Sequence, residues 1–178
     1  MNGCRTVSRD GFGEFAIRER IEEMRFCSIH KRECASLIDM RILFLREDCK
    51  DTSEEQFCKI AENLPSYFEN HIDKDCFAFG AYDNEKLVSV ALLLLIEKSS
   101  NPRFVTGRIG EVLNVYTVPE YRRQGIATRV MQMLMDFAKE NALDFVELKA
   151  TKNGYPLYKK LYFVESPTTY ISMKRILE

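Results

Sequence analysis

The chain has 178 residues, of which 46% are hydrophobic and 30% charged, a composition typical of a single globular domain with its own core. Its net charge of −1 excludes recognition of nucleic acid or of an anionic membrane through an overall positive charge. The longest apolar run, Leu87–Ile96, is far too short to span a bilayer. We therefore expect neither a nucleic-acid partner nor a membrane partner.

The cysteines and histidines follow no metal-binding pattern. None of the six cysteines forms a C-x-x-C pair, and the two histidines, His30 and His71, lie far apart in the sequence. A zinc site needs clustered ligands, so we predict no metal. A chain of this length can build its own core without disulfides and shows no secretory leader, which favours reduced thiols in a cytoplasmic protein.

Residues 1–24 differ from the rest of the chain. Three glycines (Gly3, Gly11 and Gly13) and scattered charges leave no clear hydrophobic period before Met24. We expect a poorly structured or loosely docked N-terminal arm here, followed by one domain over residues 25–178.

From Arg25 onward the sequence alternates between strand-like and helix-like segments. Arg25–His30 is strand-like, and the hydrophobic residues of Glu33–Arg46 recur at a nearly helical spacing. A second helix follows, capped by Thr52 or Ser53, with Glu55 placed to complete a capping box.

The segment that contains this second helix is acidic. Between Glu47 and Asp75 there are nine acidic and three basic residues. Such a stretch is usually a solvated helix face, and an acidic wall for a cationic substrate is the alternative. Both interpretations stay open at this point.

The remaining elements include one buried strand and one strong helix. Gly110–Val118 is almost continuously apolar and β-branched, which indicates a central strand, and Pro119 ends it. Gly125–Asn141 carries a broad apolar face and predicts the strongest helix. The other expected elements are strands at Cys76–Tyr82, Lys86–Ile96 and Leu143–Ala150, a short helix at Tyr155–Leu161, and closing strands within Tyr162–Ile176, broken at Pro167.

These elements predict an α+β fold, with a mixed central sheet and helices on both of its faces. A strand, a glycine turn, a helix and a second strand follow one another over Gly110–Ala150. This is a β-α-β crossover, which is right-handed and makes its two strands parallel.

The turn Pro119–Thr128, with the sequence PEYRRQGIAT, joins the central strand to the strong helix. The first amides of a helix have no intrahelical acceptor and the helix dipole is positive there, so phosphate is a natural ligand. Gly125 and Ala127 leave room for an anion, and Arg122 and Arg123 add positive charge. The alternative is an ordinary strand-to-helix turn with exposed arginines.

The run Gly110–Phe163 resembles the core of the GNAT superfamily of N-acetyltransferases. The cofactor motif of this family is Q/R-x-x-G-x-G/A, and Arg122–Ala127 matches it at every constrained position. The resemblance implies the GNAT-like acyl-CoA N-acyltransferase fold, whose mixed sheet is mostly antiparallel, and acetyl-CoA as co-substrate. It also implies two sets of cofactor-binding residues: Val115, Tyr116 and Thr117 along the pantetheine arm, and Arg122, Arg123, Gln124, Gly125, Ile126, Ala127 and Thr128 around the pyrophosphate.

A second part of the resemblance lies in Ala150–Phe163, which is similar to the family segment ending in Leu-Tyr-x-x-x-Gly-Phe. Tyr158 falls on the tyrosine with which family members protonate the departing CoA thiolate. A phenol is protonated at neutral pH and can act as this general acid. The alternative is a core tyrosine, and Tyr162 stands where the family usually has glycine.

The general base is open between a carboxylate and water. Some family members use a glutamate on the central strand, eleven residues before the Q/R position, and Glu111 stands at this spacing from Arg122. A carboxylate there can take the proton of the attacking amine, directly or through water. A solvated glutamate at a strand end is the alternative, and many relatives rely on water alone.

The resemblance implies transfer of the acetyl group of acetyl-CoA to a primary amine by direct attack in a ternary complex. The acceptor is a small-molecule or peptide amine, and a homodimer is compatible with the resemblance. Two other functions stay open: a catalytically silent acetyl-CoA-binding sensor or interaction module, and an enzyme that acetylates protein lysines or N-termini.

Overall fold

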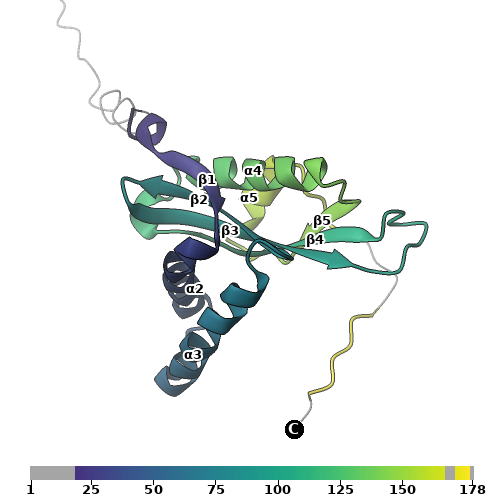
Figure 1. Ribbon diagram of the computed structural model, residues 1–178, viewed down its shortest axis with the longest axis horizontal. Coiled ribbons are helices and arrows are strands. Elements are labelled where there is room, and N and C mark those ends of the chain that lie inside the picture. The colour runs from purple at the N-terminus through teal and green to yellow at the C-terminus, as the bar shows by residue number, and fades with distance from the viewer. Residues whose placement is uncertain (1–18, 167–170, 177–178) are drawn as a thin grey trace, which may run out of the picture.

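The computed structural model describes residues 19–166 and 171–176, which fold around one five-stranded sheet (Figure 1). The strands lie in the order β1-β2-β3-β4-β5 and are antiparallel from β1 to β4, whereas β5 runs parallel to β4. The expected mixed, mostly antiparallel sheet is therefore confirmed. The strands are β1 (Arg25–Ile29), β2 (Cys76–Asp83), β3 (Lys86–Glu97), β4 (Arg108–Thr117) and β5 (Phe145–Leu148).

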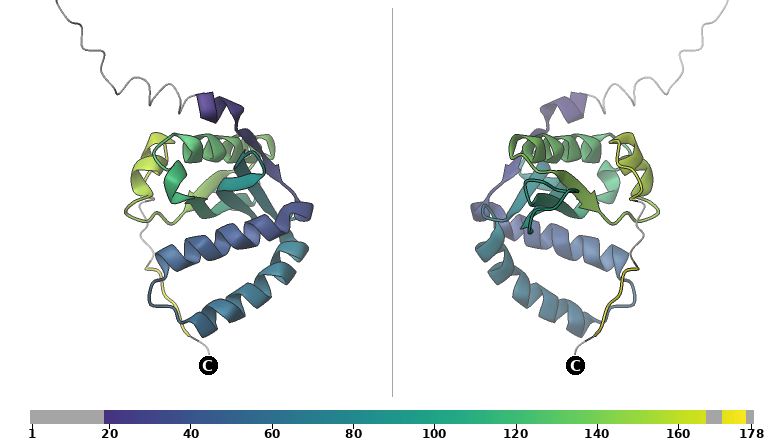
Figure 2. Two further views of the ribbon diagram at one scale, coloured as in Figure 1. Left: turned by 90° about the vertical axis from the view of Figure 1, so that its left-hand side faces the viewer. Right: turned by 90° about the vertical axis from the view of Figure 1, so that its right-hand side faces the viewer.

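Helices cover both faces of the sheet, as expected (Figure 2). On one face lies α4 (Ile126–Glu140) with the short α5 (Tyr155–Lys160) beside it, and on the other lie α2 (Cys34–Asp48) and α3 (Glu54–His71). Short 3-10 helices, η1 (Lys31–Glu33) and η2 (Pro119–Tyr121), precede α2 and α4. No helix in the described part of the chain is long and apolar enough to cross a membrane.

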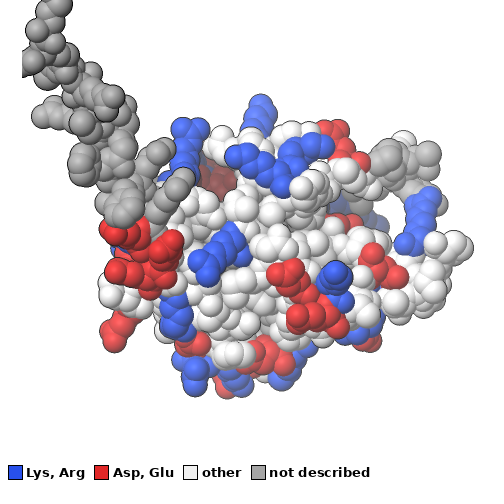
Figure 3. Space-filling view, turned by 90° about the horizontal axis from the view of Figure 1, so that it is seen from above, with Lys and Arg blue, Asp and Glu red and all other residues white. Residues whose placement is uncertain are grey.

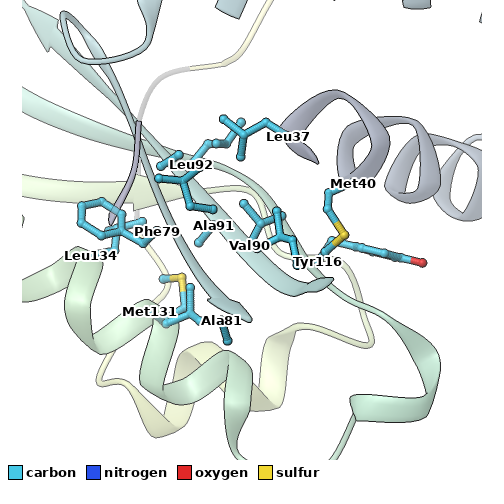
Figure 4. Close-up of a cluster of buried hydrophobic side chains, with 14 of the residues drawn as sticks. Leu37, Met40, Phe79, Ala81, Val90, Ala91, Leu92, Tyr116, Met131 and Leu134 are labelled. Carbon is cyan, nitrogen blue, oxygen red and sulfur yellow. The ribbon is translucent and has the colours of Figure 1, made fainter. Parts of the chain in front are cut away.

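Apolar side chains fill the space between the sheet and each helical layer (Figure 4). Met131 and Leu134 of α4 pack on one face, and Leu37 and Met40 of α2 pack on the other, where Tyr116 of β4 lies beside Met40. Each of these five side chains is at most 7% exposed. Burying an apolar side chain of this size contributes roughly 1.5–3 kcal/mol, so both helices are held firmly on the sheet.

A reciprocal cap fixes the start of α3. The amide of Gln56 donates to the hydroxyl of Ser53 at 3.3 Å, and the amide of Ser53 donates back to Oε1 of Gln56 at 3.1 Å. The expectation that Glu55 completes the capping box was therefore wrong. The helix begins one residue after Ser53, so the third helical position, which closes the box, is Gln56.

The closing strands expected within Tyr162–Ile176 are not found in the described part of that segment. Residues 163–166 and 171–176 form no ladder, and the side chains of Ile171 and Met173 are 87% and 91% exposed. Pro167 lies outside the described residues. An apolar sequence gives a segment the capacity to form a strand, but a strand forms only when its backbone pairs with a neighbour. The outer edge of β5 has no partner among the described residues.

The predicted N-terminal arm falls mostly outside the described residues, and its looseness stays a prediction. The described residues that precede β1 contact the domain. Arg20 donates to Oδ2 of Asp83 at 2.6 Å and to the hydroxyl of Tyr121 at 2.7 Å, and the side chain of Met24 is 5% exposed.

Lys, Arg, Asp and Glu side chains are interspersed on the surface over α4 (Figure 3). Neither sign of charge covers this face by itself. The described residues of this face therefore form no continuous basic surface.

Candidate active site

The turn between β4 and α4 presents a row of unpaired amides. Gly125 caps α4 in the left-handed conformation, with φ +83°, and its carbonyl accepts the amide of Arg129 at 3.1 Å. Within the described residues, the backbone amides of residues 123–128 have no hydrogen-bond acceptor. These six donors stand at the positive end of a helix of 15 residues. This arrangement is well suited to a diphosphate.

The shape of the turn also suits an anion. Arg123 and Gly125 are both left-handed, with φ +61° and +83°, and closely spaced left-handed residues are typical of backbone concavities that bind anions. A Cβ placed on Gly125 meets no atom within 4 Å, so the space in front of it is open. The side chain of Gln124 donates back to the carbonyl of Glu120 at 2.9 Å and holds the loop in this shape.

Arg122 was expected to add positive charge at the pyrophosphate site, but its side chain binds a carboxylate of the protein. Its guanidinium forms two hydrogen bonds to the carboxylate of Glu47 on α2, at 2.9 and 2.5 Å, and its Nε donates to the carbonyl of Thr117 at 2.8 Å. These bonds hold the pKa of Glu47 below its ordinary value. The charge of Arg122 is therefore shared with a carboxylate, and the side chain links the turn to α2.

β4 pairs with β5 only along the first half of β4, and the two strands separate beyond it. The parallel pairing involves residues 109–112 of β4, and residues 113–117 have no described strand on that side. Just beyond the parting lies a bulge: Leu113 is opposite Leu92 and Tyr116 opposite Val90, and the bulge residue Asn114 has φ +52°. The open backbone edge is one that an extended ligand can pair with as an additional strand.

Tyr116 and Thr117 turn their side chains into the protein. The ring of Tyr116 is 7% exposed, contacts the ring of Phe44 edge-on with centroids 6.3 Å apart, and lies under the guanidinium of Arg122 at 5.4 Å. The hydroxyl of Thr117 is hydrogen-bonded to that of Ser89 at 2.8 Å. Val118 bonds to Val88 of β3, so the alternation of the ladder directs the backbone of Tyr116 to β3 and that of Thr117 to the open edge. There the amide of Thr117 is available to a ligand, whereas its carbonyl accepts from Arg122.

Glu111 lies on the face of the sheet that α2 covers. It is opposite Leu94 on β3, while Tyr116 is opposite Val90. Leu94 and Val90 are four residues apart on one strand, so their side chains point to the same face. Because Tyr116 contacts Phe44 of α2 on that face, Glu111 lies on the α2 face as well.

Tyr158 is half-buried at the centre of α5. A Cβ on Gly154 would lie 3.0 Å from its ring, so the missing side chain there lets the ring pack. Burial raises the pKa of Tyr158, which keeps the phenol protonated. Its hydroxyl has no hydrogen-bond partner among the residues that the structure describes. The nearby Tyr162 has φ +64°, the left-handed conformation that glycine favours, although it is not glycine.

Most carboxylates of the acidic stretch lie beside a basic side chain, which is Lys or Arg in four cases and histidine in two. Six of its nine carboxylates lie within 4 Å of a basic side chain: Glu47, Glu54, Glu55, Glu69, Asp73 and Asp75. This favours the interpretation as a solvated helix face over an acidic wall. In the part of the chain that the structure covers, no three His, Cys, Asp or Glu residues are grouped so that they could hold a metal ion.

Sequence reasoning missed three residues of this region. Asn114 forms the bulge, Glu47 holds Arg122, and Arg41 of α2 donates to Oδ1 of Asn114 at 3.2 Å. The two contacts join residues 73 and 75 positions apart, so no local pattern in the sequence indicates them.

Comparison with known proteins identifies the family. The model of the GNAT acetyltransferase family matches residues 40–163. A predicted acetyltransferase from Clostridium acetobutylicum, crystallised with acetyl-CoA, is 26% identical over 85% of this chain and 96% of its own, with a TM-score of 0.75. No curated protein matches the chain.

Two more distant structures share the fold. A GCN5-related N-acetyltransferase from Ralstonia eutropha is 21% identical over 85% of this chain and 98% of its own, with a TM-score of 0.73. An aminoglycoside acetyltransferase from an uncultured soil metagenomic sample, in complex with sisomicin, is 14% identical over 88% and 98%, with a TM-score of 0.62. The family match spans most of the chain, from α2 to the end of the Tyr158 segment. The chain therefore belongs to the GNAT family of acetyltransferases and is an acyltransferase enzyme.

Proposed function

We propose that the protein transfers the acetyl group of acetyl-CoA to a primary amine by direct attack within a ternary complex. The observation that carries this proposal is the row of free amides at residues 123–128, placed next to the open edge of β4. One continuous surface thus offers donors for a diphosphate and a backbone edge for an extended chain.

The residues present fit the pyrophosphate, the pantetheine arm and the thioester of acetyl-CoA. The pyrophosphate lies against the amides of the turn, where Gly125 and Ala127 admit it and Arg123 adds charge. The pantetheine arm follows the backbone of Val115, Tyr116 and Thr117 toward the bulge. The thioester carbonyl then meets a backbone amide of this strand, which stabilises the negative charge that develops on its oxygen.

The reaction needs one nucleophile and two proton transfers. The neutral amine attacks the thioester carbon, the carbon–nitrogen bond forms, and the carbon–sulfur bond breaks with its electron pair on sulfur. Tyr158 donates its phenolic proton to the departing thiolate, because the phenol is protonated at neutral pH and its hydroxyl has no hydrogen-bond partner among the described residues. Glu111, directly or through water, accepts the proton that the amine loses. Because a thioester is already activated, holding both substrates together supplies much of the rate.

The experiment that tests this proposal measures release of CoA thiol when the purified protein is mixed with acetyl-CoA and a panel of amines. Mass spectrometry of the acetylated products identifies the acceptor. Acetyl-CoA binding without CoA release for any small-molecule amine or peptide would replace the enzyme by the silent sensor or interaction module. Products on peptides alone would favour the protein-modifying enzyme.

The acceptor class is a small-molecule or peptide amine. The relative crystallised with sisomicin is an aminoglycoside acetyltransferase, which supports including polyamines and amino sugars in the panel. We further propose a cytoplasmic location and a homodimer; sedimentation of the purified chain tests the latter.

A further inference from the structure

Arg41 is a half-buried cation that has no carboxylate partner in the part of the chain that the structure describes. Among the described residues, its only hydrogen bond goes to the neutral amide oxygen of Asn114, at 3.2 Å, and its guanidinium lies 5.6 Å from the ring centroid of Phe44. No described carboxylate lies within 4 Å of it. Arg46 on the same helix, in contrast, forms two hydrogen bonds to Glu54, at 2.6 and 2.8 Å.

This position is less favourable for a guanidinium than a fully solvated one, although none of its nitrogen atoms is both buried and without a partner. Burial lowers the pKa of Arg41, and Asp48 at the end of α2 acts on it only from beyond ion-pair distance. A guanidinium carries five N–H donors, and a single neutral acceptor satisfies only one of them. An ionised acceptor would form stronger, two-pronged bonds, so the remaining donors are suited to a carboxylate or another anion.

The place of Arg41 in the fold connects it with the proposed reaction. Its partner Asn114 is the bulge residue just beyond the point where β4 and β5 part, which is where the thioester end of acetyl-CoA lies in the proposed function. Glu111 stands three residues earlier on the same face of the sheet, and the parallel register puts Glu147 beside it. A positive group and a negative group therefore flank the reaction point on the α2 face.

We propose that Arg41 binds a carboxylate of the acceptor, so that the preferred acceptor is a primary amine that also carries a carboxylate. This inference rests on the proposed function and names its substrate class. The amine points to Glu111 and the thioester, while the carboxylate lies against the guanidinium. The competing explanation is that Arg41 only holds the bulge through Asn114.

The test compares pairs of acceptors that differ in one group. Glycine, β-alanine and 4-aminobutyrate are each assayed against the corresponding carboxamide, with release of CoA thiol as the readout. We expect the wild type to favour the carboxylate of at least one pair by about 10- to 100-fold in kcat/KM, the range for losing a hydrogen bond to a charged group. The best chain length then measures the spacing between the two binding groups.

Variants of Arg41 separate specificity from structure. Arg41→Gln is expected to reduce kcat/KM for the carboxylate alone, so that the ratio within a pair falls toward one, while the affinity for acetyl-CoA stays unchanged in calorimetry. Arg41→Lys keeps the positive charge and is expected to retain part of the preference for the carboxylate over the carboxamide. Arg46→Gln, on the same helix and paired with an exposed carboxylate, is the matched control and keeps the full ratio.

Each other outcome overturns the inference. If Arg41→Gln lowers kcat/KM equally for the carboxylate and the carboxamide of a pair, Arg41 only holds the bulge. If the wild type shows no preference for carboxylates, the proposed substrate class is excluded, even if Arg41→Gln does not fold. If the wild type acetylates amines that lack a carboxylate as well as their carboxylate counterparts, this inference fails and the proposed function stands. If it binds acetyl-CoA and releases no CoA with any amine, both fail.

Discussion

The glycine at the start of α4 gives the sharpest test of the proposed pyrophosphate site. Gly125 has φ +83°, and a Cβ there meets no atom within 4 Å. In Gly125→Ala the added methyl group therefore causes backbone strain but no clash. A left-handed alanine costs about 1–2 kcal/mol, which for a chain of this size lowers Tm by roughly 2–8 °C. The protein should still fold.

The effect on acetyl-CoA should be larger than the effect on stability. The methyl group stands in the open space in front of the amides, where the proposed pyrophosphate lies. Loss of one charge-assisted hydrogen bond, about 1.5–3 kcal/mol, weakens binding by roughly 10-fold or more. Titration calorimetry with acetyl-CoA measures this loss, and thermal unfolding followed by circular dichroism measures the strain.

Gly107 provides the matched control. It also has a left-handed φ, +76°, but a Cβ there lies 2.5 Å from the carbonyl oxygen of Lys98. Gly107→Ala is therefore expected to lower Tm more than Gly125→Ala and to leave the affinity for acetyl-CoA unchanged. Wild-type affinity in Gly125→Ala, or equal losses of affinity in both variants, would refute the placement of the pyrophosphate at this turn.

Three further predictions concern single side chains. Tyr158→Phe should lower kcat by about 100-fold or more without changing acetyl-CoA affinity, because the general acid is lost; a normal kcat would assign Tyr158 to packing. Glu111→Gln should lower kcat/KM most at low pH, where the acceptor amine, with a pKa of about 10.4, is almost fully protonated and needs a base; a ratio to wild type that stays constant with pH would exclude this carboxylate as the base. Iodoacetamide at about pH 8 should label the exposed Cys49 and Cys58 and spare Cys76, since burial raises the pKa of Cys76 to about 12 and the reactive form is the thiolate. Peptide mapping of the folded protein reads out the labelled sites, and rapid alkylation of Cys76 would contradict its burial.

The features that the sequence predicted well depend on neighbouring residues. Gly125 precedes α4 in the left-handed conformation, which glycine adopts without a steric penalty, so this residue alone indicates where the helix begins. The amphipathic period of α4 determines which of its faces meets the sheet. The parallel pairing of β4 with β5 also follows from the order of the elements along the chain, since a strand-helix-strand unit makes a right-handed crossover between parallel strands.

The features that the sequence did not predict depend on contacts between distant segments. Arg122 was expected to bind the cofactor pyrophosphate. Its bonds to Glu47 depend on the position of α2 over β4, which the local sequence does not indicate. The bulge at Asn114 has no local signature either, because asparagine is common in many turns. The closing strands expected within Tyr162–Ile176 likewise depend on a neighbouring strand, which the local sequence does not indicate.

The bonds between Arg122 and Glu47 have a consequence for how the two substrates affect each other. Any phosphate oxygen that draws Arg122 away from Glu47 loosens the end of α2, the helix that carries Arg41. The affinities for acetyl-CoA and acceptor are then thermodynamically coupled, and each substrate must change the affinity of the other by the same factor. Because the pKa of Glu47 is lowered, this link stays intact at mildly acidic pH and is lost only as the pH falls through that lowered value.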